Sequence, residues 1–214
     1  MHLYVATNNR GKLRELQALF VPAGWVLETY PEYAEPVEGE TSYQENAALK
    51  ARALAQQLRA AGIVAPTLGD DSGLEISALG GRPGVLSARY GGAAADWAAR
   101  RRLLLAEVAQ SASRDRRARF VCALHLVAQD GSECAVLADV EGRLALHERG
   151  ALGFSYDPIF EYPPLGRTFA ELTEKEKNRV SHRGRAARAL MAQLSRGPGM
   201  GEPNGPGPGC SSAW

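Results

Sequence analysis

The chain has 214 residues and a formal net charge of +1, with 45% hydrophobic and 23% charged residues. This length allows one large domain or two lobes with a sizeable core, and the near-neutral charge excludes a global field that attracts nucleic acid or an anionic membrane. The three cysteines lack metal-ligand spacing, no apolar run approaches the roughly 20 residues that span a bilayer, and the first residues predict a strand rather than a secretion signal. We therefore expect reduced thiols and a cytoplasmic protein.

A strand, a polar loop and a helix are predicted at the start of the chain. Residues 3–6 are apolar, residues 7–12 read Thr-Asn-Asn-Arg-Gly-Lys, and apolar residues then recur with helical spacing up to Phe20. The N-terminus of such a helix presents free N–H groups, and Arg10 and Lys12 add positive charge, so the loop could bind phosphate. The Walker spacing is absent, and an asparagine N-cap before a solvated basic turn explains the same residues. This motif alone leaves both interpretations open.

An acidic loop interrupted by prolines, residues 31–40, follows a strand predicted over residues 25–30. A long helix is then predicted over about residues 42–61, and its first residues fit a capping box. The loop glutamates fit a solvated linker that favours the helix dipole. They also fit a metal site in which Glu38 reaches a magnesium ion, because magnesium uses one or two carboxylates together with phosphates and water.

Two adjacent carboxylates form the centre of the pattern. An apolar run, residues 63–68, leads into Gly-Asp-Asp-Ser-Gly, and residues 74–76 resume an apolar alternation as a short strand. We expect Asp70 and Asp71 to lie in a turn at the tip of the apolar run. Because unpaired carboxylates are costly to bury, this turn requires a divalent metal, a basic side chain or solvent as its partner. We favour a metal ion with a phosphate ester beyond it.

The middle of the chain predicts a loop, a helix and a hairpin. The glycine-rich residues 80–92 fit either a surface loop or the wall of a site, and a helix follows over residues 94–108. Strands over residues 120–128 and 133–140 flank Asp130-Gly131, which predicts a type I′ turn. A set of arginines resembles a nucleic-acid patch, but interleaved acids and the near-neutral total favour a solvated face. These arginines are Arg100, Arg101, Arg102, Arg114, Arg116, Arg117 and Arg119.

Two further segments carry candidate ligand contacts. Residues 150–160 place Phe154 and Tyr156 beside Asp157, an arrangement that fits stacking on a purine or an ordinary aromatic turn. A last helix is predicted over about residues 173–194. Its middle carries side chains that can clamp phosphates or read a base edge, or that form a solvated basic face: Lys177, His182 and Arg183.

Taken together and in order, these motifs resemble the inosine triphosphate pyrophosphatase family, whose enzymes remove ITP, dITP and XTP from nucleotide pools. The resemblance is collinear over about residues 3–195. Any one motif is weak, but their common order and compatible spacing are specific. The motifs are Thr7-Asn8-Asn9-Arg10-Gly11-Lys12, Ser42-Tyr43-Gln44-Glu45-Asn46-Ala47, Asp70-Asp71-Ser72-Gly73-Leu74, Gly80-Gly81-Arg82-Pro83-Gly84, Ser87-Ala88-Arg89-Tyr90, Phe154-Ser155-Tyr156-Asp157-Pro158 and Ser181-His182-Arg183-Gly184.

The resemblance implies an elongated α/β fold with a mixed central sheet, two lobes and a nucleotide cleft between the lobes. We expect one nucleotide pyrophosphatase domain over residues 1–196, followed by a disordered Gly/Pro-rich tail, residues 197–214. The resemblance also implies Mg²⁺-dependent hydrolysis of a purine nucleoside triphosphate to the monophosphate and pyrophosphate. The expected protein is a homodimer without a nucleic-acid or membrane partner.

The resemblance further assigns roles to individual residues. Asp71 is the expected general base and a metal ligand, and Glu38 is the expected second metal ligand. His182 and Arg183 are expected to distinguish a 6-oxo purine from adenine. The full set of expected substrate contacts is Thr7, Asn8, Asn9, Arg10, Gly11, Lys12, Ser72, Phe154, Ser155, Tyr156, Asp157, Lys177, His182 and Arg183.

Two positions depart from the family pattern. Ser155 stands where the family usually has glycine, inside the expected base pocket. In the acidic loop, Val37-Glu38-Gly39-Glu40 replaces the commoner Glu-Glu-Thr-Gly. The second departure makes Glu38 the first metal candidate and Glu40 the second.

Three alternatives remain open. The first is a pyrophosphatase of related fold that acts on pyrimidine or modified nucleotides, and the second is a non-catalytic nucleotide sensor. The third is a nucleic-acid-binding module that uses the arginines. Pyrophosphate release across a panel of nucleotides separates the first two from the expected enzyme, and steep salt dependence of nucleic-acid binding would indicate the third.

Overall fold

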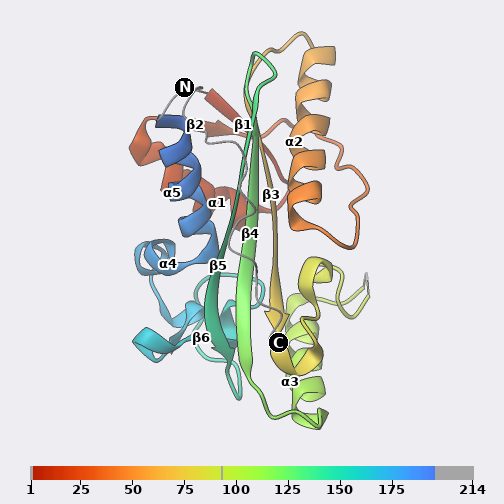
Figure 1. Cartoon of the computed structure of the whole chain (residues 1–214), viewed down its shortest axis with the longest axis vertical. Helices are drawn as coiled ribbons and strands as arrows, with labels where there is room; N and C mark the ends of the chain where they lie inside the picture. Colours follow the sequence, from red (N-terminus) through yellow and green to blue (C-terminus); the bar gives the residue numbers. More distant parts are fainter. Residues whose placement is uncertain (1, 93, 196–214) are drawn as a thin grey trace, which may run out of the picture.

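A computed structural model describes residues 2–92 and 94–195, and these residues form a seven-stranded mixed sheet with helices on both faces (Figure 1). The strand order is β2-β1-β3-β4-β5-β6-β7. The strands are β1 (His2–Ala6), β2 (Val26–Glu28), β3 (Thr67–Ile76), β4 (Arg117–Val127), β5 (Glu133–Leu144), β6 (Phe160–Tyr162) and β7 (Arg167–Thr168). The α-helices are α1 (Arg10–Phe20), α2 (Tyr43–Ala60), α3 (Trp97–Gln110), α4 (Glu174–Val180) and α5 (His182–Ser195).

The predicted mixed α/β fold is confirmed. Strand β1 pairs in parallel with β2 and β3, whereas β3 to β7 pair successively in antiparallel fashion. The long strands β3, β4 and β5 run along most of the elongated molecule (Figure 1). Two apolar clusters lie along these strands: one joins them to β1, α1 and α5, and the other joins their opposite ends to α3 and the aromatic residues around β6. The two clusters are the cores of two lobes that share one sheet.

The helices cover the two faces of the sheet near β1 separately. On one face, Leu68 packs in the cluster that contains the apolar residues of α1 and α5. On the other face, the Thr67 hydroxyl donates a 2.8 Å hydrogen bond to the Ala51 carbonyl of α2. Helices α1 and α5 lie on one side of the sheet and α2 lies on the other (Figure 1). Because successive residues of a strand point to opposite faces, alternate side chains of β3 are directed toward α1 and α5 or toward α2.

The predicted starts of α1 and α2 are confirmed by their N-caps, whereas α3 begins at Trp97 and not at residue 94. The Asn9 side chain accepts hydrogen bonds from the main-chain N–H groups of Gly11 and Lys12 at 2.9 and 3.1 Å, which fixes the first turn of α1. Ser42 Oγ accepts from the Glu45 N–H at 3.1 Å and caps α2. These caps fix the residues at which the two helices begin.

The expected turn at Asp70 and Asp71 is wrong. Both residues lie inside β3, which continues from Thr67 to Ile76 and pairs with β4 along this whole length. Consequently the separate short strand expected over residues 74–76 is part of the same strand. The prediction placed both carboxylates in a turn and favoured a metal ion over a basic side chain or solvent as their partner. In the structure, basic side chains from distant helices lie beside both carboxylates inside the sheet.

The single helix expected over residues 173–194 is interrupted. It divides at Ser181, whose extended backbone (φ −68°, ψ 158°) separates α4 from α5. Ser181 Oγ accepts a 3.1 Å hydrogen bond from the Gly184 N–H and so satisfies the start of α5. The apolar periodicity continues across this break, which explains why the sequence pattern did not reveal it.

Two other local expectations are also corrected. The hairpin between β4 and β5 is a longer loop over residues 128–132, in which Gly131 has a positive φ of 86° but Asp130 does not, so the turn is not type I′. The arginine face is only partly solvated, because Arg100 is 7% exposed and lies over the Trp97 ring at 5.1 Å.

Among the described residues, no helix is both long and apolar enough to cross a membrane. The expected tail, residues 197–214, lies outside the described residues.

Candidate active site

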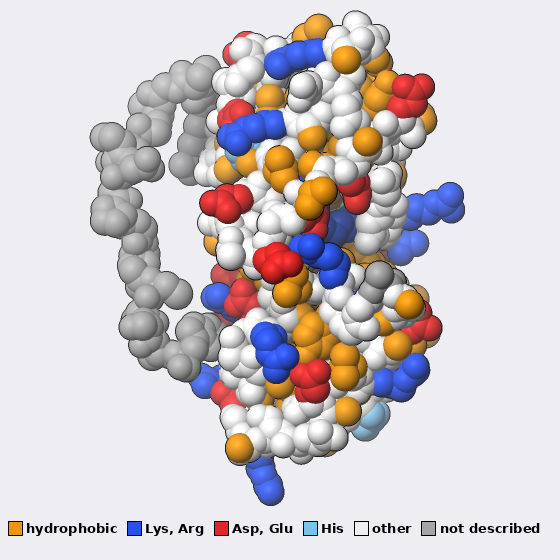
Figure 2. Space-filling model, turned by 90° about the vertical axis from the view of Figure 1, so that its right-hand side faces the viewer, with side chains coloured by type: hydrophobic (Ala, Val, Ile, Leu, Met, Phe, Trp, Pro, Cys, Tyr) orange, Lys and Arg blue, Asp and Glu red, His pale blue; other side chains and the backbone are white. Residues whose placement is uncertain are grey.

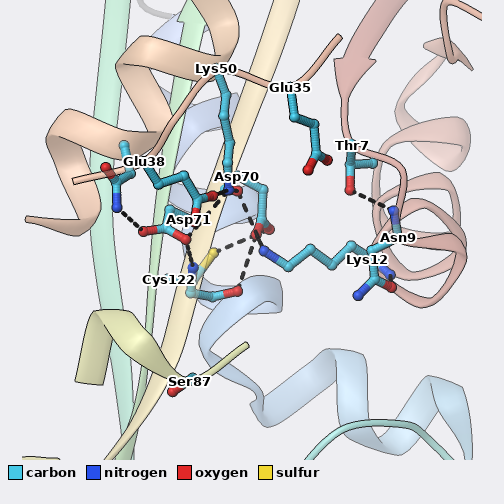
Figure 3. Close-up of polar contacts among 12 residues, drawn as sticks. Thr7, Asn9, Lys12, Glu35, Glu38, Lys50, Asp70, Asp71, Ser87 and Cys122 are labelled. Atoms are coloured by element: carbon cyan, nitrogen blue, oxygen red, sulfur yellow. Dashed lines mark hydrogen bonds and ion pairs between the residues drawn. The ribbon is translucent and has the colours of Figure 1, made fainter. Parts of the chain in front are cut away.

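The candidate site lies where β1 ends and β3 continues. The parallel pairing of these strands stops at Ala6 and Gly69, one residue before Asp70. Two lysines occupy this position: Lys12 Nζ and Lys50 Nζ both donate to the Asp70 carbonyl, at 3.4 and 3.2 Å. Beyond the end of β1, the edge of β3 that pairs with β1 borders the cleft, while the other edge stays paired with β4. Figure 3 shows the side chains at this position.

Asp70 points toward α1 and α5 and is 1% exposed. Its carboxylate accepts a 2.7 Å hydrogen bond from Arg183 Nε and pairs with Lys12 Nζ at 2.6 Å. Burial alone would raise the pKa of Asp70, but Arg183 and Lys12 outweigh burial and hold this pKa well below its usual range. Asp70 is therefore charged at neutral pH and anchors the two cations.

Asp71 points to the opposite face, toward α2. Its carboxylate accepts from Asn46 Nδ2 at 3.1 Å and from the Ser72 N–H at 3.0 Å, and Lys50 Nζ lies 3.5 Å away (Figure 3). Burial raises the pKa of Asp71, and the Lys50 ammonium opposes this rise only in part. Asp71 is thus the more basic of the two carboxylates, and the ion pair that compensates it is looser.

The acidic loop is fastened to Asp71 through Asn46. The Asn46 amide accepts from the Gly39 N–H at 2.8 Å and donates to the Gly39 carbonyl at 3.2 Å, while it also donates to Asp71. This arrangement places Glu38 beside Lys50, with which it forms a short ion pair (Figure 3). Glu40 instead lines a separate hollow formed with residues 75–86.

Six buried or half-buried charges of alternating sign connect the two sides of the cleft. Glu15 lies at the centre, because it is 3% exposed and pairs with both Arg183 and Lys177. Lys177 then pairs with Asp157, which accepts a 2.8 Å hydrogen bond from the Phe154 N–H. The complete chain of ion pairs is Lys12, Asp70, Arg183, Glu15, Lys177 and Asp157.

Arg183 is engaged mainly with protein groups. In addition to its bonds with Asp70 and Glu15, it donates from Nη2 to Ser72 Oγ at 2.8 Å, and it is 2% exposed. The sequence predicted that this side chain reads a base edge. In the structure, most of the Arg183 donors already have protein acceptors, so this side chain fixes the positions of Asp70 and Ser72.

His182 differs from its neighbour Arg183. Its ring stacks on Phe120 with centroids 4.6 Å apart and an interplanar angle of 11°. Burial lowers the pKa of His182 well below its usual value, and the nearby cations Arg183 and Lys177 lower it further, so the ring is neutral. Its Nδ1 is buried without a hydrogen-bond partner in the described part of the chain. Such an atom requires a partner, and a bound ligand can supply one.

The aromatic loop, residues 154–157, forms the opposite wall of the cleft. Phe154 lies against the first turn of α1, where a Cβ added to Gly11 would meet its ring at 2.8 Å. Ser155 has a φ of 59°, the one positive value among the described non-glycine residues. Tyr156 is fully buried and donates a 2.8 Å hydrogen bond to the Ser87 carbonyl.

The first loop, residues 7–12, reaches the cleft through two of its residues. Asn9 and Lys12 line the cleft, whereas the remaining loop residues do not. Thr7 Oγ1 accepts from the Asn9 N–H at 3.1 Å (Figure 3). The Asn8 N–H donates to Glu35 at 3.2 Å. Arg10 is exposed at the start of α1. The loop thus holds its own conformation through short polar contacts and presents one ammonium to the cleft.

The structure brings most of the predicted residues into one cleft. Its lining includes nearly all of the predicted set: Asn9, Lys12, Glu38, Asp71, Ser72, Phe154, Ser155, Tyr156, Asp157, Lys177, His182 and Arg183. Predicted residues outside the lining are Thr7, Asn8, Arg10 and Gly11. The hollowed surface between the two lobes is visible in Figure 2, with basic and acidic side chains beside it.

Sequence reasoning did not assign roles to Lys50 or Glu15. Lys50 follows Asn46 by four residues on α2, and Glu15 follows Lys12 by three residues on α1. Residues with these spacings share a helix face, so the same periodicity that predicted the helices contained the signal. The helix partners of β3 were the missing information, because they decide which face meets the carboxylates.

The donor types of Asp71 and Glu38 are compatible with the expected magnesium ion. Asp71 and Glu38 both approach the ammonium of Lys50, so these oxygens can face one cation. Among the described residues, no group of three or more His, Cys, Asp or Glu side chains is placed to hold a metal. Two carboxylates suit Mg²⁺, whose remaining ligands are then phosphates and water.

These features define an elongated α/β protein with an inter-lobe cleft that contains a buried network of carboxylates and cations. The sequence profile of the Ham1 family matches residues 3–193. The chain therefore belongs to the Ham1 family, and the family resemblance predicted from the motifs is confirmed.

Relatives match the chain over nearly its whole length. A protein from Thermus thermophilus named "dITP/XTP pyrophosphatase" is 46% identical over 200 residues, which are 92% of this chain and 94% of the relative. A protein of the same name from Gloeobacter violaceus is 46% identical over 91% of this chain and 95% of the relative. The solved structure of a HAM1 protein from Coxiella burnetii has a TM-score of 0.78 at 37% identity, covering 92% of this chain and 99% of the other.

Proposed function

We propose that this protein hydrolyses dITP, ITP and XTP to the monophosphate and pyrophosphate in a Mg²⁺-dependent reaction. Its family membership makes it a nucleoside triphosphate pyrophosphatase, because relatives that cover nearly its whole length are named dITP/XTP pyrophosphatases. The observation that carries the proposal is the content of one cleft. Asp71 and Glu38 both face the Lys50 ammonium in this cleft. A neutral His182 and the Phe154 ring line the same cleft.

Asp71 is the proposed general base. It accepts the proton of the attacking water while the water oxygen bonds to the α-phosphorus, and the bond to the bridging oxygen then breaks to release pyrophosphate. Asn46 and the Ser72 N–H orient the carboxylate. Because burial raises the pKa of Asp71, its carboxylate is a stronger base than an exposed aspartate.

Lys12 and Lys50 are the proposed phosphate-neutralising cations. Asp70 holds Lys12 at the end of β1, and Lys50 contacts the same main-chain carbonyl from α2. Fixed cations at this position stabilise the charge that develops on the phosphates without reorganisation. Asp71 and Glu38 would hold Mg²⁺, which when bound supplies further charge neutralisation on the phosphate oxygens.

His182 is the proposed reader of the base edge. A 6-oxo purine and adenine present opposite donors and acceptors at position 6, so one fixed polar atom distinguishes them. The unpartnered Nδ1 of a neutral, stacked His182 is such an atom. The proposed share of Arg183 is to orient Asp70 and Ser72 next to His182, and the aromatic ring of Phe154 offers a stacking surface.

The proposal also includes a homodimer in the cytoplasm that binds no nucleic acid. The near-neutral charge of the chain supports the absence of nucleic-acid binding, and the unpaired thiols Cys122 and Cys134 in the described residues fit a reducing compartment. The homodimer rests on the family resemblance. Sedimentation equilibrium tests the dimer, and nucleic-acid binding at low and high salt tests the last point.

A substrate panel tests the proposed function. Pyrophosphate release is measured with dITP, ITP, XTP, GTP, ATP, dTTP and UTP, each with Mg²⁺ and with a chelator. We expect release from dITP, ITP and XTP in the presence of Mg²⁺ and little release from ATP. Preference for dTTP or UTP would indicate a pyrimidine enzyme, and binding without release would indicate a nucleotide sensor.

A further inference from the structure

Ser155 has a backbone conformation that its surroundings must maintain. Its φ of 59° lies in the left-handed region, which non-glycine residues rarely adopt because Cβ crowds the following carbonyl oxygen. Ser155 belongs to the aromatic loop, residues 154–157, and each residue of this loop lines the cleft. A change at this one φ angle would therefore move the wall against which a ligand packs.

Arg101 of α3 supplies a contact that holds this conformation. Its Nη1 donates a 2.8 Å hydrogen bond to the Ser155 carbonyl, and its Nη2 pairs with Glu148 at 3.0 Å. The Arg101 side chain is only 14% exposed, so solvent competes weakly for these donors. The two ends of one rigid guanidinium thus join the aromatic loop to the segment that precedes it.

Helix α3 contacts the next loop residue as well. Trp97, one helical turn before Arg101, packs edge-to-face on Tyr156 with ring centroids 5.3 Å apart. The opposite end of Tyr156 donates its hydroxyl to Ser87. Helix α3 therefore contacts two consecutive residues of the aromatic loop, one through its carbonyl and one through its ring.

We propose that Arg101 is a positioning residue that fixes the conformation of Ser155 and thereby helps to determine which nucleobase the cleft accepts. This inference rests on the proposed function for its choice of substrates. Arg101 itself does not line the cleft, so it acts through the Ser155 carbonyl. Loss of the hydrogen bond frees the strained residue to leave the left-handed region, which displaces Phe154 and Tyr156 on either side of it.

A double-mutant cycle tests this coupling, because glycine adopts a positive φ without an anchor. The variants are Arg101→Met, Ser155→Gly and the combination of both. Arg102→Met is the matched control, since Arg102 is exposed on the same helix. The kcat and KM for dITP and dATP are measured by pyrophosphate release. Hydrogen exchange of the peptide that spans residues 153–160 is measured by mass spectrometry in the absence of nucleotide.

We expect Arg101→Met to raise KM for dITP about tenfold, to lower the dITP-to-dATP preference and to speed exchange in residues 153–160. In the Ser155→Gly background, the same substitution is expected to change KM less than about threefold. Arg102→Met is expected to stay within about twofold of the wild type in KM.

Three results would overturn the inference. The first is unchanged exchange and KM in the folded Arg101→Met variant, and the second is an equal effect in both backgrounds. The third is an equal effect of Arg102→Met, which would indicate general damage to α3. If the wild type released no pyrophosphate from any nucleotide, the proposed function would fail. The exchange data would still decide whether Arg101 holds Ser155.

Discussion

Asp70 and Asp71 are consecutive residues of β3, but their carboxylates lie on opposite faces of the sheet and have their pKa values shifted in opposite directions. Asp70 contacts Lys12 and Arg183, which lower its pKa, whereas Asp71 contacts Asn46 and Lys50 and has its pKa raised by burial. A strand alternates its side chains, so it can present one carboxylate as an anchor and the next as a base. This separation of roles determines several measurable properties.

Asp70→Asn is expected to destabilise the fold strongly. The substitution leaves the buried guanidinium of Arg183 and the ammonium of Lys12 without their shared carboxylate. Breaking a buried pair by removal of one partner costs about 3–5 kcal/mol. Urea unfolding measures the change, with Asp71→Asn as the matched control, for which we expect a change of no more than about 1 kcal/mol. Similar losses in both variants would contradict the distinct roles.

The acid dependence of activity and stability should differ. The pKa of Asp70 is lowered in the folded state, so its stabilisation is present above its unfolded pKa of about 3.9 and is lost as pH falls through its lower folded pKa. The pKa of Asp71 is raised. On acidification, Asp71 is therefore expected to lose its basic form at a higher pH than the pH at which the stabilisation by Asp70 is lost.

The pH dependence of kcat/KM, measured beside that of unfolding in the same buffers, checks this order. We expect activity to fall first as the solution is acidified, while the protein remains folded. Coincident loss of activity and fold would show that Asp71 does not limit the reaction on the acid side.

His182→Phe is expected to reduce the preference for dITP over dATP. Phenylalanine keeps the aromatic stack on Phe120 but removes the buried, unpartnered Nδ1. Loss of one such hydrogen bond corresponds to roughly a tenfold to hundredfold loss of discrimination. The ratio of kcat/KM for the two nucleotides is the measurement, and an unchanged ratio in a folded variant would exclude His182 as the reader of the base.

Glu38→Gln is expected to weaken the binding of Mg²⁺ at the site. Glu38 lines the cleft and pairs with Lys50, whereas Glu40 lines a different hollow. We therefore expect the Mg²⁺ concentration for half-maximal pyrophosphate release to rise about tenfold or more in Glu38→Gln and to change little in Glu40→Gln. The opposite order of the two variants would assign the metal to Glu40.

The sequence predicted which residues line the cleft better than it predicted the elements that carry them. Helix periodicity and N-caps located α1 and α2, because these signals depend on neighbouring residues. The break at Ser181 and the strand through Asp70 and Asp71 depend on tertiary contacts instead. Two adjacent acidic residues predict a turn when only the sequence is considered. In the structure they lie in a strand because cations from α1, α2 and α5 surround them.

Ser155 shows the same limit in another form. The sequence marked it as a departure from glycine in an aromatic loop, but the positive φ and the contact with Arg101 depend on how α3 docks. Similarly, the sequence shows Glu15 only as a polar residue of a predicted helix. Its ion pairs with Lys177 and Arg183 depend on how α4 and α5 pack against α1. Long-range charge pairs of this kind leave no local pattern in one sequence.

Pyrophosphate release from dITP with Mg²⁺ by the wild type and by Asp71→Asn tests whether the protein is a pyrophosphatase with Asp71 as its general base. We expect the wild type to form the monophosphate and pyrophosphate, and the folded variant to lose a factor on the order of 10²–10⁴ in rate, as is typical for removal of a general base. Turnover by Asp71→Asn at the rate of the wild type would contradict the account.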